Sequence, residues 1–334
     1  MRRIQTMPRI LVLAALAVAA PAAAQQSIDQ TVPTNRTGRV EIHNLAGSVR
    51  VVAWDRDQIQ IRGELGRGTE RLEVSGDRNR TVIRVILPRN ARNVQGSDLV
   101  VQVPAQKDVG VQTTSADVAI ENSTGTVQGQ STSGDVTITG NPASVTGRST
   151  SGDVRVTVGS SARVNASSTS GDVVVRGNIR ESVSVESVSG DVDVSGATPE
   201  VRAKTVSGDV VLRGVTGRVS AGTVSGDAHV RDSRIQFGAF ETVSGNFTFD
   251  GELPARAAFN IQSHSGTVEM RIPSNTSAEF DVRTFSGDIR NELGPDAERT
   301  SRYGPGRELR FTAGSGGGLV SLKTFSGNVR ILRR

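Results

Sequence analysis

A short corner motif recurs along most of the chain and limits the folds that the chain can adopt. The tripeptide Ser-Gly-Asp begins at Ser133, Ser151, Ser170, Ser189, Ser207, Ser225 and Ser286, and looser copies begin at Ser115, Ser244, Ser265 and Ser326. The central residues of successive copies lie 18 to 21 residues apart, except for one step of 40 before Gly327. A fixed period of this size indicates a repeat architecture.

Apolar residues flank each corner with period two. Six positions before the serine the chain carries Val127, Val145, Val164, Val183, Val201 and Val219, and three positions after it Val136, Val154, Val173, Val192 and Val210. The residue two before the serine is always Ser or Thr. Alternation dominated by valine is typical of β-strands, and Gly and Asp supply turn conformations. Each unit is therefore predicted to hold two short strands.

One unit is too small to bury its apolar side alone, so successive units must stack. We predict an all-β, single-domain parallel β-solenoid (β-helix) of about 12 coils with two short strands per coil, right-handed winding being the expected hand. A left-handed hexapeptide helix would place an aliphatic residue at every sixth position, whereas the apolar residues here are two and seven positions apart. A calcium-binding nonapeptide roll would show two Gly-Asp corners per coil, whereas this chain shows one. A β-propeller with two units per blade fits the period, but nothing distinguishes odd from even units, so it is the third choice of fold.

The two ends depart from the regular pattern. Residues 40–51 fit the template and are expected to form the amino-terminal coil of a cap that covers 40–108 with irregular strands, after a linker at 25–39. Residues 109–334 hold the regular repeats, with a surface loop at about 292–318. All nine Phe lie between Phe237 and Phe325, where the period lengthens, which predicts a thicker core there.

The first 24 residues have the pattern of an export signal. Arg2 and Arg3 precede an apolar run from Ile10 to Ala20, and Ala22 to Ala24 provide small residues at a cleavage site. The run is too short to span a membrane, and no second long apolar run follows, so no integral membrane segment is expected after cleavage. The localisation indicated is periplasmic, secreted or cell-surface.

Composition excludes several classes of protein. The chain has no cysteine, so disulfides and thiolate metal sites are impossible. Only 3% of residues are aromatic, which argues against an aromatic stacking platform for nucleic acid or sugar. Without the three arginines of residues 1–24, Lys+Arg falls from 39 to 36 against 34 acids, so the net charge falls from +5 to +2. A nucleic-acid partner is therefore not expected.

The combination of these motifs resembles a known family. The opening with Ile42, Gly47, Val49, Val51 and Trp54, the strand Leu99 to Pro104, the Ser-Gly-Asp-Val series and the closing Thr-Phe-Ser-Gly units are similar to the bacterial "putative adhesin" β-strand-repeat family. The resemblance covers about residues 34 to 334 and implies an exported, non-catalytic β-solenoid. The family offers no active site to transfer.

No motif for catalysis stands out. His43 and His229 occupy outward strand positions of the template, and His264 lies just before a corner. The many Ser and Asp are explained by the turns, and no nucleophile-elbow motif frames them. We therefore expect no enzyme and no cofactor, but a monomeric adhesin or envelope-binding protein with a protein or glycan partner. The alternatives are a self-assembling envelope scaffold and a carbohydrate-active β-helix enzyme, which would need two carboxylates in a cleft.

Two columns of side chains are candidates for binding. The residue before each corner serine should point outward, which gives an apolar stripe of Val188, Val206, Val224, Val243, Phe285 and Phe325 with His264 among them. Contiguous exposed apolar patches often mark interaction sites. The second column is a ladder of corner acids, Asp135, Asp153, Asp172, Asp191, Asp209 and Asp227. Each acid either accepts a local backbone N–H in an Asx-turn or joins its neighbours in holding a cation such as calcium.

The remaining corner residues carry two further expectations. The Ser or Thr two before each corner and the corner serine itself, such as Ser189, share parity with the valine columns, and both are expected to face inward. The corner glycine, such as Gly190, is expected to adopt a backbone conformation that other residues avoid.

Overall fold

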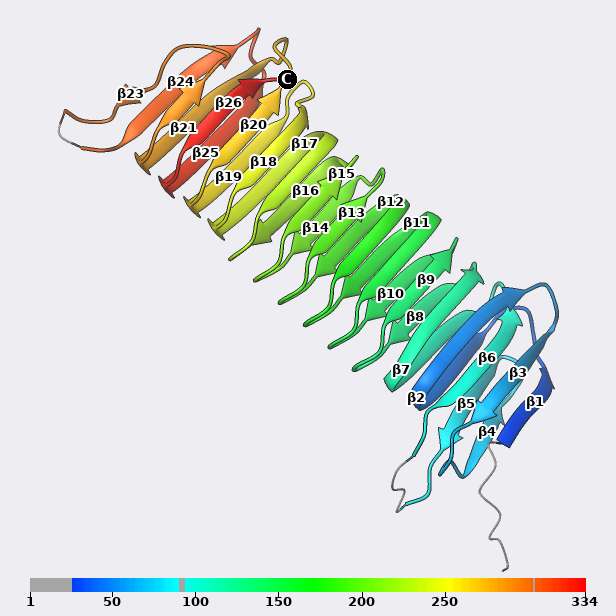
Figure 1. Ribbon diagram of the computed structural model, residues 1–334. Coiled ribbons are helices and arrows are strands. Elements are labelled where there is room, and N and C mark those ends of the chain that lie inside the picture. Colours follow the sequence, from blue (N-terminus) through cyan, green and yellow to red (C-terminus); the bar gives the residue numbers. More distant parts are fainter. Residues whose placement is uncertain (1–25, 90–93, 303) are drawn as a thin grey trace, which may run out of the picture.

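The chain folds into β-structure throughout the residues that the computed structural model describes, which are 26–89, 94–302 and 304–334. These ranges contain strands and turns but no helix. The strands stack along one axis into an elongated, β-solenoid-like body, as Figure 1 shows. The prediction of an all-β parallel stack is therefore confirmed. The predicted export signal lies outside the described residues.

The regular coils each contribute strands to two faces of the stack. Their strands are β7 (Asp108–Ser123), β8 (Thr126–Gln130), β9 (Val136–Gly140), β10 (Ser144–Arg148), β11 (Val154–Ser167), β12 (Val173–Glu186), β13 (Val192–Ser195), β14 (Glu200–Lys204), β15 (Val210–Arg213), β16 (Thr216–Thr223), β17 (Ala228–Ser244), β18 (Phe247–Glu252), β19 (Ala258–Ser265) and β20 (Val268–Ile272). Pairing is parallel and in register, with Val127 opposite Val145 on one face and Val136 opposite Val154 on the other. Like residues therefore stack on like residues.

The core is the set of ladders that this register creates. The valines six before and three after each corner are at most 1% exposed from Val127 to Val219. Towards the carboxy terminus phenylalanines take their place, and the rings of Phe249 and Phe259 meet edge to face at 5.1 Å. Gly238 replaces valine here because a Cβ on it would lie 2.6 Å from the ring of Phe240. The predicted thicker core is formed by this Phe cluster.

From Ser131 to Thr223 the hydroxyl two before each corner is buried and bonded to the coil beneath. Ser187 Oγ donates to the carbonyl of Gly171 at 3.0 Å and accepts from the amide of Gly190 at 3.0 Å. The same pair of bonds recurs from Ser131 to Thr205, and Thr223 repeats the first of them. The inward orientation predicted for this column is confirmed, and from Ser131 to Thr223 the hydroxyls join each corner to the previous coil, whereas those of Thr242 and Thr324 have no partner among the described residues.

The corner serine and glycine differ from the prediction. Ser133, Ser151, Ser170 and Ser189 are exposed, because the chain turns at this point and the glycine takes the inner position. Gly190 is buried, yet its φ lies outside the left-handed region. It is glycine for lack of space: a Cβ there would lie 2.1 Å from the carbonyl oxygen of Gly171. The expectation for the corner serine was therefore wrong, and that for the corner glycine holds only at Gly266 and Gly287, with φ of +115° and +153°.

The amino-terminal cap uses antiparallel strands. It comprises β1 (Gln26–Pro33), β2 (Arg39–Trp54), β3 (Gln58–Leu65), β4 (Arg71–Gly76), β5 (Arg80–Ile86) and β6 (Ser97–Pro104). β2 pairs in parallel with β7 on one side and with β5 and β6 on the other, so it is not the end of the stack. Beyond it β3 runs antiparallel to β6, and β1 antiparallel to β3. Residues 26–33, predicted as linker, are thus an edge strand.

The last coil of the sequence is not the last coil in space. This end contains β21 (Ala278–Ser286), β22 (Ile289–Asn291), β23 (Glu298–Arg299), β24 (Arg307–Ala313), β25 (Gly318–Ser326) and β26 (Val329–Arg333). β25 lies between β19 and β21, with Val320 opposite both Phe259 and Phe280. β26 lies likewise between β20 and β22.

The segment at 292–318 is more than the predicted surface loop. It holds β24, which pairs antiparallel with β21 and places Leu309 opposite Val282. Leu309 is 3% exposed, so β24 covers the outer coil with apolar side chains. The prediction failed because a 40-residue gap in the repeat does not reveal that the chain turns back to insert its final coil.

We predict that the corner glycines are intolerant of any side chain. Gly190→Ala is expected to lower the free energy of unfolding by about 3 kcal/mol or more, since the new Cβ meets backbone that cannot move away. Gly214→Ala is the matched control: Gly214 has φ +66 but no atom within 4 Å of a Cβ. It should cost only about 1–2 kcal/mol. Equal losses in urea unfolding would contradict the crowding account.

A second prediction concerns acid sensitivity of the amino-terminal cap. Hydrogen bonds from the backbone amides of Arg80 and Asn79 lower the pKa of Asp77 below its ordinary value of 3.8. This stabilisation is fully present above pH 3.8 and is lost as pH falls through the lower folded-state pKa. Asp77→Asn should therefore flatten the acid limb of the melting-temperature profile. Asp296→Asn, an exposed acid at the other end, should not, and equal profiles for wild type and Asp77→Asn would refute the link.

Candidate functional site

The apolar stripe lies on the outer surface of the stack as a continuous column. The exposed fractions are 46% for Val188, 44% for Val206, 42% for Val224, 38% for Val243, 59% for Phe285 and 51% for Phe325. The prediction from strand alternation that these side chains point outward is therefore confirmed. The rings of Phe285 and Phe325 stay more than half exposed, because β24 packs beside β21 rather than over the stripe.

The aromatic end of the stripe is a stack of three rings. His264 and Phe325 lie 5.0 Å apart with planes at 3°, and Phe325 and Phe285 lie 4.9 Å apart at 5°. The order in space is His264, Phe325, Phe285, which differs from the order in the sequence because β25 is inserted. In-register stacking therefore gives the stripe a flat, fixed aromatic end.

A column of polar residues runs beside the stripe. Two positions before the stripe residue the coils carry Glu186, Lys204, Gly222, Glu241, Gln262, Lys323 and Arg283 in spatial order. The column is interrupted at Gly222. Two positions farther from the stripe on the same outer face, the coil of Gly222 and the coil after it carry the small residues Ser220 and Ala239. This interruption leaves a hollow on this face of the stack.

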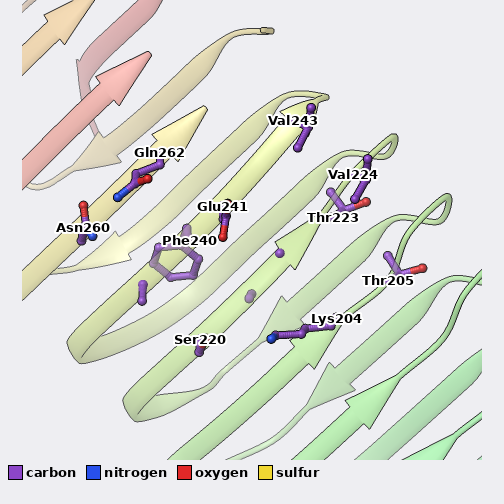
Figure 2. Close-up of a pocket in the computed structure, with 13 residues that line it drawn as sticks. Lys204, Thr205, Ser220, Thr223, Val224, Phe240, Glu241, Val243, Asn260 and Gln262 are labelled. Carbon is purple, nitrogen blue, oxygen red and sulfur yellow. The ribbon is translucent and has the colours of Figure 1, made fainter. Parts of the chain in front are cut away.

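The hollow has a volume of about 360 Å³ and is bordered by two residues of the stripe, Val224 and Val243. Figure 2 shows Lys204 on one side of it, Asn260 and Gln262 on the other, and Glu241 between them. Sequence reasoning did not find this site. Aligning the columns would have shown the run of small residues, since the coils that carry Lys204, Gly222, Glu241 and Gln262 stack in sequence order.

The corner acids form a relay between coils rather than Asx-turns within them. Asp191 Oδ1 accepts the amide of Asp209 at 2.8 Å, and Asp172 Oδ1 accepts the amide of Asp191 at 2.9 Å. The relay continues from Asp117 to Asn246 and on to Thr267. The local turn predicted for these acids was wrong because the acceptor serves the next coil. One oxygen per carboxylate is thereby committed to the backbone.

Neither metal-binding clusters nor membrane-spanning helices occur in the described part of the chain. Within 26–89, 94–302 and 304–334 no group of three or more His, Asp or Glu side chains is placed to hold a metal ion. In the same ranges no helix has the length and apolar character that a membrane crossing requires.

The three histidines lie at separate places. His43 is on β2, where burial lowers the pKa of its ring, and His229 is on β17. His264 belongs to the aromatic end of the stripe. None of them therefore shares a site with another.

Comparison with known families identifies the relatives of this fold. The Toastrack family, DUF4097, matches residues 37–216 and 219–332. The chain belongs to the Toastrack family. This agrees with the "putative adhesin" family of unknown function that the sequence motifs resemble. No curated protein matches the Toastrack chain.

Two solved structures show distant similarity to the chain. A "putative cell adhesion protein" from Clostridium sporogenes is 6% identical with a TM-score of 0.21, covering 92% of this chain and 100% of the other. A "putative adhesin" from Bacteroides fragilis is 11% identical with a TM-score of 0.27, covering 92% and 98%. At these TM-scores neither likeness bears on the fold or function of the Toastrack chain.

We predict that the relay depends on an acceptor oxygen and not on charge. Asp191→Asn keeps the oxygen, as Asn246 and Asn328 do in the native chain, and should change the free energy of unfolding by less than about 0.5 kcal/mol. Asp191→Ala removes it from the amide of Asp209 and should cost about 1 kcal/mol in urea unfolding. Equal losses for both variants would indicate that the negative charge itself matters, as a bound cation would require.

Proposed function

We propose that this protein is an exported, non-catalytic binding protein of the bacterial envelope that uses the apolar stripe to hold an envelope component. Its body is proposed to be a right-handed solenoid of about 12 coils that acts as a stiff rod. The observation that supports this most directly is the stripe, whose seven side chains are held in one line by the register of the strands beneath.

Rigidity is what makes the stripe suitable for binding. The corner backbone that carries it is bonded from coil to coil, since Val206 donates its amide to the carbonyl of Val188 and Val224 donates to that of Val206, so little conformational entropy remains to be lost when a partner docks. The stacked rings of Phe325 and Phe285 present flat apolar area, and aromatic side chains commonly dominate binding energy at interfaces. The stripe is therefore the proposed contact surface.

Capped ends favour a monomeric rod over the alternative of a self-assembling scaffold. An open end strand would be a template for another copy. Here β1 and β4 are short antiparallel edges, and the outer edge strand β24 carries Arg307, Glu308 and Arg310. Charged and short edges discourage edge-to-edge pairing.

Export and location complete the proposal. The mature protein is proposed to begin near Gln25 and to reside in the periplasm or at the cell surface. Cell fractionation with amino-terminal sequencing of the mature chain tests this: a chain that retains Arg2 and Arg3 in the cytoplasmic fraction would contradict it.

The stripe is tested by cosedimentation of the mature protein with purified cell envelopes of the producing bacterium. We expect the double variant Phe285→Thr, Phe325→Thr to fold normally and to bind at least about 10-fold more weakly, because two exposed anchor rings are lost. Leu319→Thr is the matched control, since Leu319 is 53% exposed on the same coil as Phe325 but off the stripe.

Three outcomes of this experiment would contradict the proposal. They are equal binding by the double variant and the wild type, equal loss in the Leu319→Thr control, and no cosedimentation of the wild type. Release of soluble sugar from the envelopes during incubation would contradict the non-catalytic assignment and favour the carbohydrate-active enzyme.

A further inference from the structure

The hollow beside the stripe is a built feature of the surface rather than a gap between loops. Its floor consists of paired strand residues, Ser220, Gly222 and Ala239, on β16 and β17. A Cβ on Gly222 would lie 3.1 Å from the carbonyl oxygen of Glu241 and 3.7 Å from its Cβ, against 2.1 Å from backbone for a Cβ on Gly190, and the column neighbours of Gly222 carry long side chains. Glycine is therefore not required here for folding in the way that Gly190 is. Its smallness creates the space.

The polar groups around the hollow are not engaged with the rest of the chain. The side chains of Lys204, Glu241, Asn260 and Gln262 are exposed and make no hydrogen bond or ion pair with any described residue. Together they offer an ammonium and two amides as donors, and a carboxylate and two amide oxygens as acceptors. Figure 2 shows these four side chains around one space. A ligand rich in hydroxyl groups could use all of them.

Charge at the hollow is balanced, which limits the class of ligand. Lys204 contributes one positive charge and Glu241 one negative charge, while nearby Arg202 is already paired with Glu200 at 2.6 Å. A phosphate or carboxylate would gain from Lys204 but be opposed by Glu241. The set therefore fits a neutral ligand better than an anionic one.

One wall of the hollow is apolar. Val224 and Val243 of the stripe form it, and they are 42% and 38% exposed. A pyranose ring has the matching character, with C–H groups on its faces and hydroxyls around its edge. The volume of about 360 Å³ is at the small end of the range for ligand sites, as a single ring requires.

We propose that this hollow binds one neutral pyranose unit of a glycan. The sugar lies with an apolar face against Val224 and Val243. Its hydroxyls donate to Glu241 and accept from Lys204, Asn260 and Gln262. The inference rests on the proposed function, since it identifies the envelope component as a neutral glycan and places its binding site beside the stripe.

Saturation-transfer NMR and calorimetry with neutral tetrasaccharides of glucose, mannose, galactose and N-acetylglucosamine test this inference. At least one is expected to bind the wild type, and Gly222→Val, which fills the floor, should raise its Kd at least about 10-fold. Ala239→Gln fills the hollow from the neighbouring column and serves if Gly222→Val folds poorly. Ser167→Val is the matched control in the same column but away from the hollow, and its Kd should stay within about 2-fold.

The failure of this inference is distinguishable from failure of the proposed function. Binding of none of the four sugars overturns it, as does equal affinity for wild type and both filled variants. Tighter binding of a tetramer of galacturonic acid would overturn the assignment of a neutral ligand. Each of these results leaves the cosedimentation of the Phe285 and Phe325 variants unaffected, since those residues lie outside the hollow.

Discussion

The close contact between corner glycines of successive coils is the constraint on which the rest of the structure depends. Each corner lies so near the next that a Cβ on Gly190 would come within 2.1 Å of the carbonyl of Gly171. This contact sets the register, and the register aligns every other column. The buried hydroxyls and the Asp relay then join the same corners by hydrogen bonds. The glycine contact, the hydroxyl bonds and the Asp relay together fix the spacing between successive coils.

The register explains both the core and the surface. Inside, like residues stack into valine ladders that give way to phenylalanine near the carboxy terminus. Outside, the same repetition lines up Val188 to Phe285 into a stripe and makes a single run of small residues into a hollow. The repetition ends at both termini of the stack. At the amino-terminal end β6 lies outside β2, and at the carboxy-terminal end β21 lies outside β25; antiparallel strands follow beyond each of them. The binding surface and the capped ends therefore follow from one stacking rule.

Period-two alternation predicted what depends on neighbours along the chain: the strands, the valine columns and the exposure of the stripe. It failed where the chain turns, since Ser189 leaves the alternation and Gly190 takes the inner position. It also failed where the partner lies in another coil, as for Asp191 and the amide of Asp209. The insertion of β25 between β19 and β21 and the resulting ring order have no local signal, so the stripe could be predicted but its aromatic stack could not.

Hydrogen exchange at the corners tests the central claim most directly. The amides of Asp191 and Asp209 lie on the exposed edge of the stack, yet each donates to a carboxylate of the previous coil at 2.8–2.9 Å. The account predicts that these amides exchange as slowly as the strand amide of Val192, because opening them requires separating two coils. Exchange as fast as in the turn at 294–302 would show that the corners are not joined and would contradict the stacking rule.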